Sequence, residues 1–411
     1  MSFSEKQKEI LRFPYRDEYD ALICDGAVRS GKTSIMSLSF VLWMMAGFNR
    51  CSFAFCGKSV GAVERNIIQP LLSVRYLQQQ FQLTYNRSGH VLTVRRGDKE
   101  NRIYLFGGKD ESSYMLIQGI TLAGVLLDEV ALMPRSFVEQ ALARCSVTGA
   151  KYWFNCNPEN PLHWFRQEWI LKAEKRRALH LHFLMDDNPS LDDKTRERYR
   201  NLYAGVFYER YILGRWVMAE GLIYDMLDLT ANTYKAEDAP VGFKSRSTRT
   251  IAVDYGTTNP TCYEDIFDDG ETVRVHREYR WDSRKEHRQK TDEEYADDFM
   301  RFMGDEPCAA IVDPAAASFI TALRQRGVYV IEANNDVLNG IRKTGTLLSH
   351  RELLICKDCV GLLDELGTYR WDDKAALMGV EKPVKQQDHG PDAVRYYINS
   401  LPDWRFESVQ T

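Results

Sequence analysis

The sequence lacks the features that would assign it to a special class of protein. Its 411 residues show no internal repeat and no low-complexity segment, and neither charge dominates, since 54 Lys and Arg stand against 58 Asp and Glu. The longest apolar run, near residues 40–46, is far shorter than the roughly 20 residues that span a membrane. With 44% hydrophobic and 27% charged residues, the composition excludes a disordered tail, a collagen or a coiled-coil rod. The length instead indicates a globular protein of about two domains.

Cysteine is scarce and shows no framework pattern. The nine cysteines are odd in number and scattered, and the first residues include no apolar segment of the kind that a secretion signal needs. We therefore expect a reducing, cytoplasmic setting, with the thiols as small core residues. Cys356 and Cys359 have the spacing of half a zinc site or a redox pair. Because no second pair exists and leucines surround them, two packed thiols are the favoured interpretation.

Charge is distributed unevenly along the chain. Residues 1–220 contain 30 Lys and Arg and 24 Asp and Glu, a net of +6, whereas residues 221–411 contain 24 and 34, a net of −10. The two parts are therefore expected to do different work. Residues 218–248 mix Gly, Asn, Pro and Ser, which is typical of a boundary. The predicted organisation is an N-terminal domain at 1–217, a linker at 218–248 and a C-terminal domain at 249–411.

Short apolar runs alternate with helical stretches in the first domain, which predicts an α/β fold with a mainly parallel sheet covered on both faces. Strands are predicted at 21–24, 52–57, 124–128 and 152–155, a helix at 33–45, and a hairpin that turns at Gly97 and Asp98. In the second domain, strands are predicted at 250–254, 272–279, 309–313 and 328–331. A turn at 268–271 is expected to join the first two of these, and helices are expected at 293–303, 316–325 and 392–400.

The strongest motif is the octapeptide from Gly26 to Thr33, which matches G-x-x-x-x-G-K-[ST] between a predicted strand and a predicted helix. Glycine lets backbone N–H groups turn around phosphate oxygens, and the helix that follows directs its positive end at the same anion. Lys32 is expected to reach the β- and γ-phosphates, and the Thr33 hydroxyl to coordinate Mg²⁺. The motif therefore predicts an ATP site that includes Gly26, Arg29, Ser30, Gly31, Lys32 and Thr33.

Acidic and amide side chains follow two more of the predicted strands. Asp128 is interpreted as holding Mg²⁺ through water, and Glu129 as activating the attacking water. Asn155 ends the strand at 152–155 and Asn157 follows it, at a point where an amide can sense the γ-phosphate, and Asn157 is the candidate nucleotide contact. The competing interpretation of this segment is a plain Asn-Pro turn.

Two features of the predicted ATP site stay open. Arg29, inside the loop, could stabilise charge on the γ-phosphate in cis, while Arg144 is a weaker candidate for a charge-stabilising finger. Gln7 precedes the nucleotide-binding core, and its amide could read adenine, although an exposed helix position explains it equally well.

The acidic part contains three separated carboxylates at the ends of predicted elements. Asp254 and Asp313 each end a strand, and Asp392 lies where the last helix is expected to begin. Such carboxylates can converge on two Mg²⁺ or Mn²⁺ ions that activate water and stabilise the leaving oxygen in phosphodiester hydrolysis. His389 could ligate a metal or orient a ligand. The competing interpretation of Asp392 is a helix cap.

These residues together resemble the large subunit of a tailed-phage terminase, and the resemblance covers nearly the whole chain. It implies a P-loop ATPase of the RecA/ASCE type followed by an RNase H-like nuclease, with Asp254, Asp313 and Asp392 as nuclease metal ligands near His389. ATP hydrolysis would drive double-stranded DNA into a procapsid, and a metal-dependent endonuclease would cut concatemeric DNA. The segments that carry the resemblance are Gly26 to Thr33, Leu126-Leu127-Asp128-Glu129, Asn155-x-Asn157-Pro158, Ala252-Val253-Asp254-Tyr255-Gly256, Val312-Asp313 and Asp388-His389-x-x-Asp392.

The resemblance also implies partners, which are double-stranded DNA, a small terminase subunit and the portal protein of the procapsid. It implies a homo-oligomeric ring on the portal and no membrane. Two other functions compete with this interpretation. A helicase–nuclease of DNA repair would need a second RecA-like domain after residue 220, where the acidic pattern stands instead. A DNA-binding scaffold with an inactive nuclease fold would have no need of three intact carboxylates.

Overall fold

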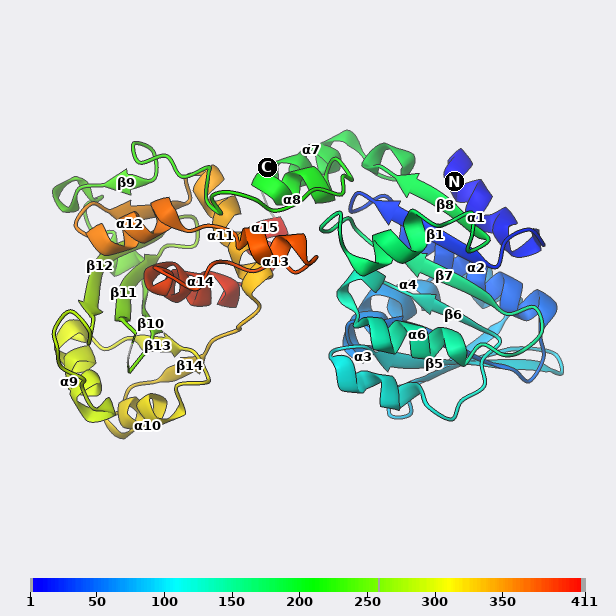
Figure 1. Ribbon diagram of the computed structural model, residues 1–411, viewed down its shortest axis with the longest axis horizontal. Helices are drawn as coiled ribbons and strands as arrows, with labels where there is room; N and C mark the ends of the chain where they lie inside the picture. The colour runs from blue at the N-terminus through cyan, green and yellow to red at the C-terminus, as the bar shows by residue number, and fades with distance from the viewer. Residues whose placement is uncertain (1–2, 258, 408–411) are drawn as a thin grey trace. The chain divides into compact units, whose positions relative to one another are not determined.

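The chain folds into two compact units, and the computed structural model describes residues 3–257 and 259–407 (Figure 1). Unit 1 takes the residues up to 197 together with 208–218, and unit 2 takes 198–207 together with the residues from 219 onward. The chain therefore passes between the units three times. None of the helices in the described part of the chain is long and apolar enough to cross a membrane.

Unit 1 is built on an eight-stranded sheet in the order β3-β4-β5-β2-β6-β7-β1-β8. In the part of the sheet that runs β5-β2-β6-β7-β1-β8, neighbouring strands are parallel, whereas β3, β4 and β5 pair antiparallel. The turn between β4 and β5 lies at Gly97 and Asp98, as predicted. The α/β prediction with a mainly parallel sheet is confirmed. The strands are β1 (Ala21–Gly26), β2 (Ser52–Gly57), β3 (Gln82–Asn86), β4 (Val91–Arg96), β5 (Lys99–Gly107), β6 (Gly124–Leu127), β7 (Lys151–Asn155) and β8 (Ala178–Phe183).

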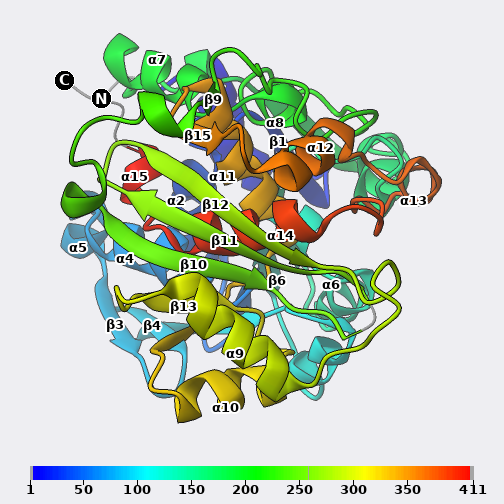
Figure 2. The ribbon, with the colours of Figure 1, turned by 90° about the vertical axis from the view of Figure 1, so that its left-hand side faces the viewer.

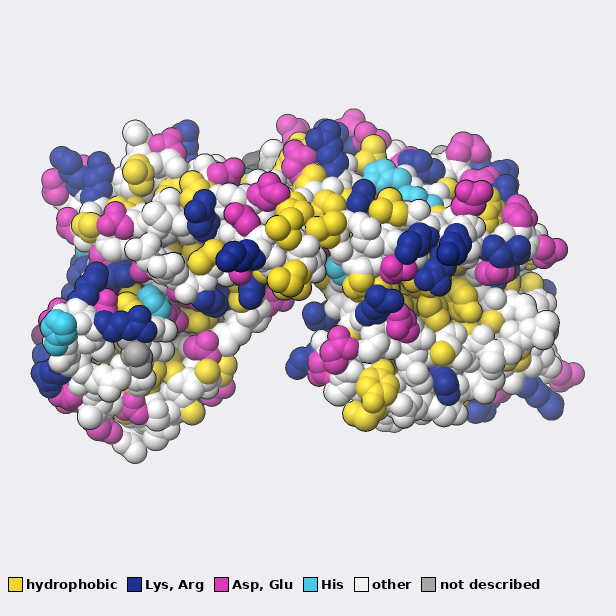
Figure 3. Space-filling view, viewed as in Figure 1, with side chains coloured by type: hydrophobic (Ala, Val, Ile, Leu, Met, Phe, Trp, Pro, Cys, Tyr) yellow, Lys and Arg dark blue, Asp and Glu magenta, His cyan; other side chains and the backbone are white. Residues whose placement is uncertain are grey.

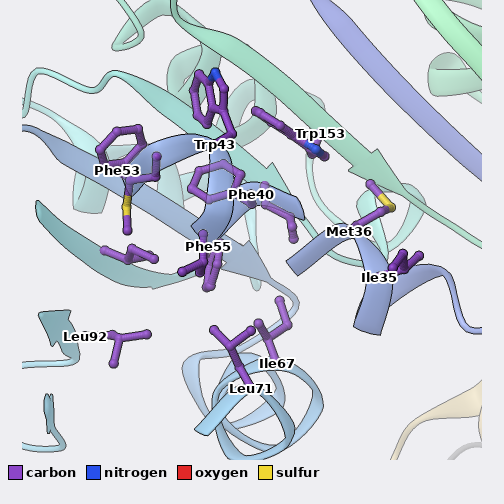
Figure 4. Packing of buried hydrophobic residues seen from close by; sticks show 14 of the residues in the cluster. Ile35, Met36, Phe40, Trp43, Phe53, Phe55, Ile67, Leu71, Leu92 and Trp153 are labelled. Atoms are coloured by element: carbon purple, nitrogen blue, oxygen red, sulfur yellow. The ribbon is translucent and has the colours of Figure 1, made fainter. Parts of the chain in front are cut away.

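Successive residues of the central strands bury their side chains on opposite faces of this sheet. On one face, Phe40 and Trp43 of α2 (Lys32–Gly47) pack against Phe53 and Trp153, with the Phe40 and Trp153 ring centroids 4.7 Å apart (Figure 4). Phe154, the next residue along β7, belongs to the core beneath α6 (Arg135–Ala143) on the other face. The sheet is therefore a rigid base for side chains at its strand ends.

Figure 3 shows acidic and basic side chains interspersed over the visible face of each unit, so the net charge of each part of the sequence is not concentrated into one patch there.

The other helices associated with the first part of the chain are short. These helices are α1 (Glu5–Arg12), α3 (Val60–Val63), α4 (Gln69–Leu72), α5 (Arg75–Gln80), α7 (Asp193–Asn201) and α8 (Gly205–Tyr211).

Unit 2 is built on a seven-stranded mixed sheet in the order β14-β13-β10-β11-β12-β15-β9. The strands β10, β11 and β12 are antiparallel, while β13 runs parallel to β10 and β15 parallel to β12 (Figure 2). Two mixed α/β sheets, one in each unit, fit the fold class predicted from the sequence. The strands are β9 (Thr233–Tyr234), β10 (Thr248–Asp254), β11 (Thr261–Asp268), β12 (Val273–Trp281), β13 (Ala309–Val312), β14 (Val330–Glu332) and β15 (Leu353–Cys356).

Helices cover both faces of the second sheet. Tyr263 of β11 packs with Tyr295 and Phe319 on the face covered by α9 (Asp292–Met303) and α10 (Ala317–Gln325). The opposite face carries α14 (His389–Ser400), which contacts β10 and β11. The remaining helices of this unit are α11 (Val337–Ser349), α12 (Val360–Thr368), α13 (Asp373–Leu377) and α15 (Trp404–Glu407).

The sequence prediction missed β11. It placed the turn at 268–271 directly after the strand at 250–254, whereas in the structure this turn joins β11 to β12. The strand was missed because its buried positions include Glu264, Asp265 and Asp268, which disguise the pattern of a core strand. Arg249 and Arg277 both donate to Asp265, which explains how that charge is accommodated.

Residues 219–248, which make up all but the first residue of the segment expected to be a linker, are part of unit 2. Its strand β9 pairs with β15 at the sheet edge, and Ile223, Tyr224 and Asn232 are buried. Composition alone indicated a loop here because the packing residues are few and widely spaced. Cys356 and Cys359 are buried and unpaired, as expected for packed thiols.

Candidate functional sites

The loop between β1 and α2 has a backbone that depends on glycine. Gly26 has φ +121°, and a Cβ at this position would clash with the carbonyl oxygen of Phe183 on β8. Gly31 has φ +81° and is the N-cap of α2, with no side chain capping the helix. The first N–H groups of α2 are thereby left for another acceptor, which is the arrangement that binds phosphate.

Lys32 is held inside this loop by oxygen acceptors. Its Nζ donates to the carbonyl oxygens of Gly26 at 3.0 Å and Ala27 at 2.6 Å, and to Asn157 Oδ1 at 3.3 Å. Burial lowers the pKa of the Lys32 ammonium, and nearby acidic groups oppose that shift. The charge is therefore fixed in position, and Asn157 is the residue after β7 that contacts it.

Thr33, Asp128 and Asn155 form a polar group at the ends of β6 and β7. Thr33 Oγ1 lies 3.0 Å from Asp128 Oδ1, and Asn155 Nδ2 donates to both oxygens, at 2.7 Å and 2.5 Å. Burial raises the pKa of Asp128, and the hydrogen bonds from Asn155 and Thr33 oppose that shift. A hydroxyl and a carboxylate oxygen in contact are ligands of the type that Mg²⁺ prefers, so these residues fit that ion.

Glu129 faces the same pocket from a left-handed backbone conformation, with φ +57°. Burial, reinforced by the neighbouring charge of Asp128, raises the pKa of Glu129 to about 7. A carboxylate with a raised pKa is a stronger base than an exposed one. The pocket has a volume of about 450 Å³, and its polar lining includes Arg29, Ser30, Gly31, Lys32, Thr33, Arg65, Asn66, Asp128, Glu129, Asn155, Asn157 and Asn188.

Three lining residues carried no motif in the sequence. Asn188 Nδ2 donates to the carbonyl oxygen of Arg29 at 2.8 Å, and Asn66 Nδ2 lies 3.4 Å from Asp128 Oδ2. Arg65, which precedes Asn66, also lines the pocket. Arg144, the weaker finger candidate, lies at the end of α6 and is not among the lining residues.

A larger cavity of about 770 Å³ adjoins Gly31 and is lined mainly by apolar side chains. Gln7 lines it and is 7% exposed, so the interpretation of Gln7 as an exposed helix residue is wrong. Its Oε1 accepts the N–H of Ser4 at 3.1 Å in a capping box, while its Nε2 lies near Gly31. The cavity is suited to a flat apolar ring next to the phosphate loop.

Asp25, the residue before Gly26 in β1, stabilises the start of the phosphate loop through its side-chain contacts. It accepts hydrogen bonds from His180 at 2.8 Å, His182 at 3.0 Å and Trp216 Nε1 at 2.7 Å. Burial on its own would raise the pKa of Asp25, but these contacts outweigh it and hold the pKa well below its usual value. The ionised Asp25 side chain therefore stabilises the strand end that precedes Gly26.

Asp25→Asn is expected to lower the stability of unit 1 by about 2 kcal/mol, because it weakens charged hydrogen bonds to two histidines. Because the folded pKa is depressed, the contribution is present above the ordinary pKa of 3.8 and is lost as the pH falls below it. Scanning calorimetry should show a difference from wild type that persists at about pH 5 to 8. Equal stability of both proteins at pH 7 would contradict this role.

In unit 2, two predicted carboxylates meet because their strands are neighbours. Val253 and Val312 are paired in the parallel register of β10 and β13, so Asp254 and Asp313 emerge at the same sheet edge. The hydroxyl of Tyr396 lies 3.3 Å from Asp254 Oδ1 and 3.1 Å from Asp313 Oδ2, and joins the pair.

His389 and Asp392 both lie in the first turns of α14. His389 Nδ1 is 2.8 Å from Asp254 Oδ2, which places the ring against the carboxylate. Asp392 is the fourth residue of α14, and Asp388 is the N-cap, so the interpretation of Asp392 as a helix cap is wrong. Asp392 contacts Lys385 at 3.1 Å and Arg395 at 3.1 Å.

The structure brings Asp254 and Asp313 together but does not group all three carboxylates. Across residues 3–257 and 259–407, no three His, Cys, Asp or Glu side chains are clustered closely enough to hold a metal ion. The three carboxylates stay apart because the Tyr396 hydroxyl contacts both Asp254 and Asp313, whereas Asp392 pairs with Lys385. Burial raises the pKa of Asp254, and repulsion from Asp392 adds to the shift, although His389 opposes it.

This donor set still fits a hard divalent cation. Mg²⁺ commonly uses one or two carboxylates and completes its shell with water and substrate phosphate. Asp254 and Asp313 supply such a pair. Burial raises the pKa of Asp254 and the nearby Asp392 adds to the shift, and a bound cation would oppose both effects. A backbone contact supports the site, since Glu365 Oε2 accepts the N–H of Gly390 at 2.7 Å and holds the start of α14.

Comparison with known proteins identifies relatives of the whole chain. A family model described as terminase large subunit, T4-like-virus type, N-terminal, matches residues 23–231. No curated protein sequence matches. The structure is similar to the large terminase of a thermophilic bacteriophage in its crystal form 2, with 48% identity, a TM-score of 0.92, and coverage of 98% of this chain and 99% of that one.

The same phage protein is also known with nucleotides bound. Its complex with ADP matches with 47% identity and a TM-score of 0.89, covering 97% of this chain and 99% of that one. Its complex with ATP-γ-S matches with 46% identity and a TM-score of 0.88 over the same shares of the two chains.

Proposed function

The chain belongs to the terminase large-subunit family, and from that premise we propose which of its residues perform the two reactions of a phage DNA-packaging motor. Family membership makes the chain an ATPase and a nuclease that act in genome packaging. The assignments below concern the individual residues, the metals and the partners. The observation that carries them is the pair of strand-end sites, one in each unit, whose side chains match the two chemistries.

The pocket beside the phosphate loop is proposed to bind ATP with Mg²⁺. Lys32 would bind the terminal phosphates, while Thr33 and Asp128 would hold the ion, whose charge offsets that of the phosphates when it is bound. Glu129, with its raised pKa, would accept a proton from the attacking water. The ADP and ATP-γ-S complexes of the thermophilic phage protein support the proposal that this chain binds a nucleotide.

Two amides at the carboxyl end of β7 are proposed to share the sensing role. Asn157 contacts the Lys32 ammonium, and Asn155 contacts the Thr33 hydroxyl and the Asp128 carboxylate. A change at the terminal phosphate would reach both amides through these partners. Gln7, whose Nε2 is directed toward the phosphate loop beside the apolar cavity, is the proposed adenine contact.

The second site is proposed to cleave DNA with two divalent ions, Mg²⁺ or Mn²⁺. Asp254 and Asp313 would hold the ions, which activate water and stabilise the leaving oxygen when bound. Asp392 lies close enough to raise the pKa of Asp254 and is the proposed third carboxylate. His389 contacts Asp254 directly, so its proposed role is to orient that ligand or to join it at the metal.

The proposed substrate is concatemeric double-stranded DNA, which the motor would cut and translocate into a procapsid. Proposed protein partners are a small terminase subunit and the portal, on which copies of this chain would form a ring in the host cytoplasm. A motor of this kind grips phosphates transiently, so strong base specificity is not required of this chain.

Removal of divalent metal tests the assignment of both sites. Purified chain should hydrolyse ATP and nick supercoiled plasmid in Mg²⁺ or Mn²⁺, and EDTA should abolish both activities until excess metal is restored. The measurements are phosphate release and plasmid electrophoresis on one preparation. Persistence of either activity in EDTA would show that the carboxylates of that site do not work through a metal.

A further inference from the structure

The segment between β2 and α5 reaches the ATP pocket through an unusual helical turn. It consists of α3, a five-residue π-helical turn labelled η2 (Glu64–Ile68), and α4. Ile67 and Ile68 are buried in the core of unit 1, while Arg65 and Asn66 line the pocket. Turns of this kind are rare and occur frequently at functional sites. The turn thus anchors two adjacent polar side chains over the phosphate loop.

Arg65 is left without a protein partner by its neighbours. The adjacent acid, Glu64, is engaged by Arg87, whose Nε and Nη2 lie 2.7 Å and 2.6 Å from Glu64 Oε1. Within the described chain, the Arg65 side chain makes no hydrogen bond or ion pair. An exposed arginine that lines an anion-binding pocket and lacks an acidic partner is available to a ligand.

Asn66 fixes the position of this arginine relative to the catalytic acids. Its Nδ2 lies 3.4 Å from Asp128 Oδ2, on the opposite carboxylate oxygen from the one that Thr33 contacts. Arg65, the preceding residue, lines this pocket together with Asp128 and does not line the cavity that Gln7 lines, so its guanidinium lies on the side where the terminal phosphate would lie. Lys32 is held by the loop carbonyl oxygens, and Arg65 would add a second cation to the same pocket, where charge moves between the phosphates.

We propose that Arg65 contacts the γ-phosphate of ATP bound to its own chain and stabilises the charge that develops during hydrolysis, with Asn66 as a positioning residue for Asp128. This inference rests on the proposed ATP site. A guanidinium suits the role because its planar fork can donate two hydrogen bonds to one phosphate. The bond to the γ-phosphorus is broken by water, ADP leaves with the bridging oxygen, and Arg65 exchanges no proton.

The test compares Arg65→Ala and Arg65→Lys with Arg102→Ala, an exposed control whose partner Glu100 keeps a second arginine, Arg95. Basal ATP turnover without DNA should fall about 100-fold in Arg65→Ala and recover partly in Arg65→Lys. ADP affinity should change by less than about threefold, because ADP lacks the γ-phosphate, whereas ATP-γ-S affinity should fall. Arg102→Ala should match wild type in every measurement.

Three outcomes would overturn the inference. The first is that Arg65→Ala hydrolyses ATP at the wild-type rate while Lys32→Met is inactive. The proposed ATP site would then stand, and Arg65 would have no role in it. The second is a defect confined to DNA-stimulated turnover, which would make Arg65 a DNA contact. The third is restored activity when Arg65→Ala is mixed with Lys32→Met, since a cis arginine cannot be supplied by another chain. If Lys32→Met retains turnover, the proposed ATP site itself fails.

Discussion

Lys32→Met is expected to reduce ATP turnover by about 10²- to 10³-fold and to leave plasmid nicking at the wild-type level. Methionine preserves much of the length and volume of the side chain but removes the ammonium that Gly26, Ala27 and Asn157 hold in place. Without that charge, the loop retains its backbone N–H groups and loses its principal contact with the terminal phosphates. The measurement is phosphate release at saturating ATP.

A second lysine-to-methionine variant is the control for the loss of one positive charge from unit 1. Lys172→Met removes an exposed lysine of unit 1 that pairs with Glu168 and lies outside the ATP pocket. It should hydrolyse ATP at the wild-type rate. Undiminished turnover in Lys32→Met would contradict the assignment of the phosphate loop, whatever the control does.

Asp254→Asn is expected to reduce nicking of supercoiled plasmid in Mn²⁺ by at least about 100-fold, because metal-mediated stabilisation supplies several kcal/mol. ATP turnover should be unchanged. The variant is not expected to lose thermal stability, because the raised pKa of Asp254 means that its ionised form destabilises the fold at neutral pH. Loss of activity without loss of stability is typical of a functional carboxylate.

The control for this substitution is Asp305→Asn, an exposed acid of the same unit, which should nick plasmid as wild type does. If Asp254→Asn cuts at the wild-type rate, the nuclease assignment is wrong. If it loses nicking together with a large fall in melting temperature, the carboxylate is structural and the metal role loses its support.

Residues at the ends of parallel strands could be placed from the sequence. The strands before Gly26, Asp128 and Asn155 have recognisable apolar runs, and parallel neighbours end at one sheet edge, so their side chains meet. Asp254 and Asp313 are also predicted at strand ends, in a group with Asp392, but the parallel pairing of β10 and β13 that brings the first two together is known only from the structure. For the ATP site the strand ends are sufficient, because no long-range loop contact is involved.

Residues that reach the sites from other directions could not be placed. Arg65 and Asn66 follow no motif, and their position depends on a π-helical turn that only the packed core defines. Tyr396 lies within the helix predicted at 392–400 and has no metal-ligand motif around it, yet its hydroxyl contacts both Asp254 and Asp313. Lys385 lies in an irregular segment whose contact with Asp392 no spacing rule predicts.

The buried acids of β11 show a further limit of sequence interpretation. Asp265 is acceptable in the core because Arg249 and Arg277 neutralise it from neighbouring strands. Such compensation exists only after the sheet has formed, so a local pattern treats the strand as polar. The strand nevertheless supports the second site, because it lies between β10 and β12 under α14.

Packaging of linear double-stranded DNA into purified procapsids, scored as DNA protected from added nuclease, tests the central claim most directly. The claim is that one unit drives translocation with ATP and the other cuts DNA with metal. With a pre-cut linear substrate, Asp254→Asn should package as wild type does, and Lys32→Met should protect no DNA. Packaging by Lys32→Met at the wild-type level, or its loss in Asp254→Asn with ATP turnover intact, would contradict this division of function.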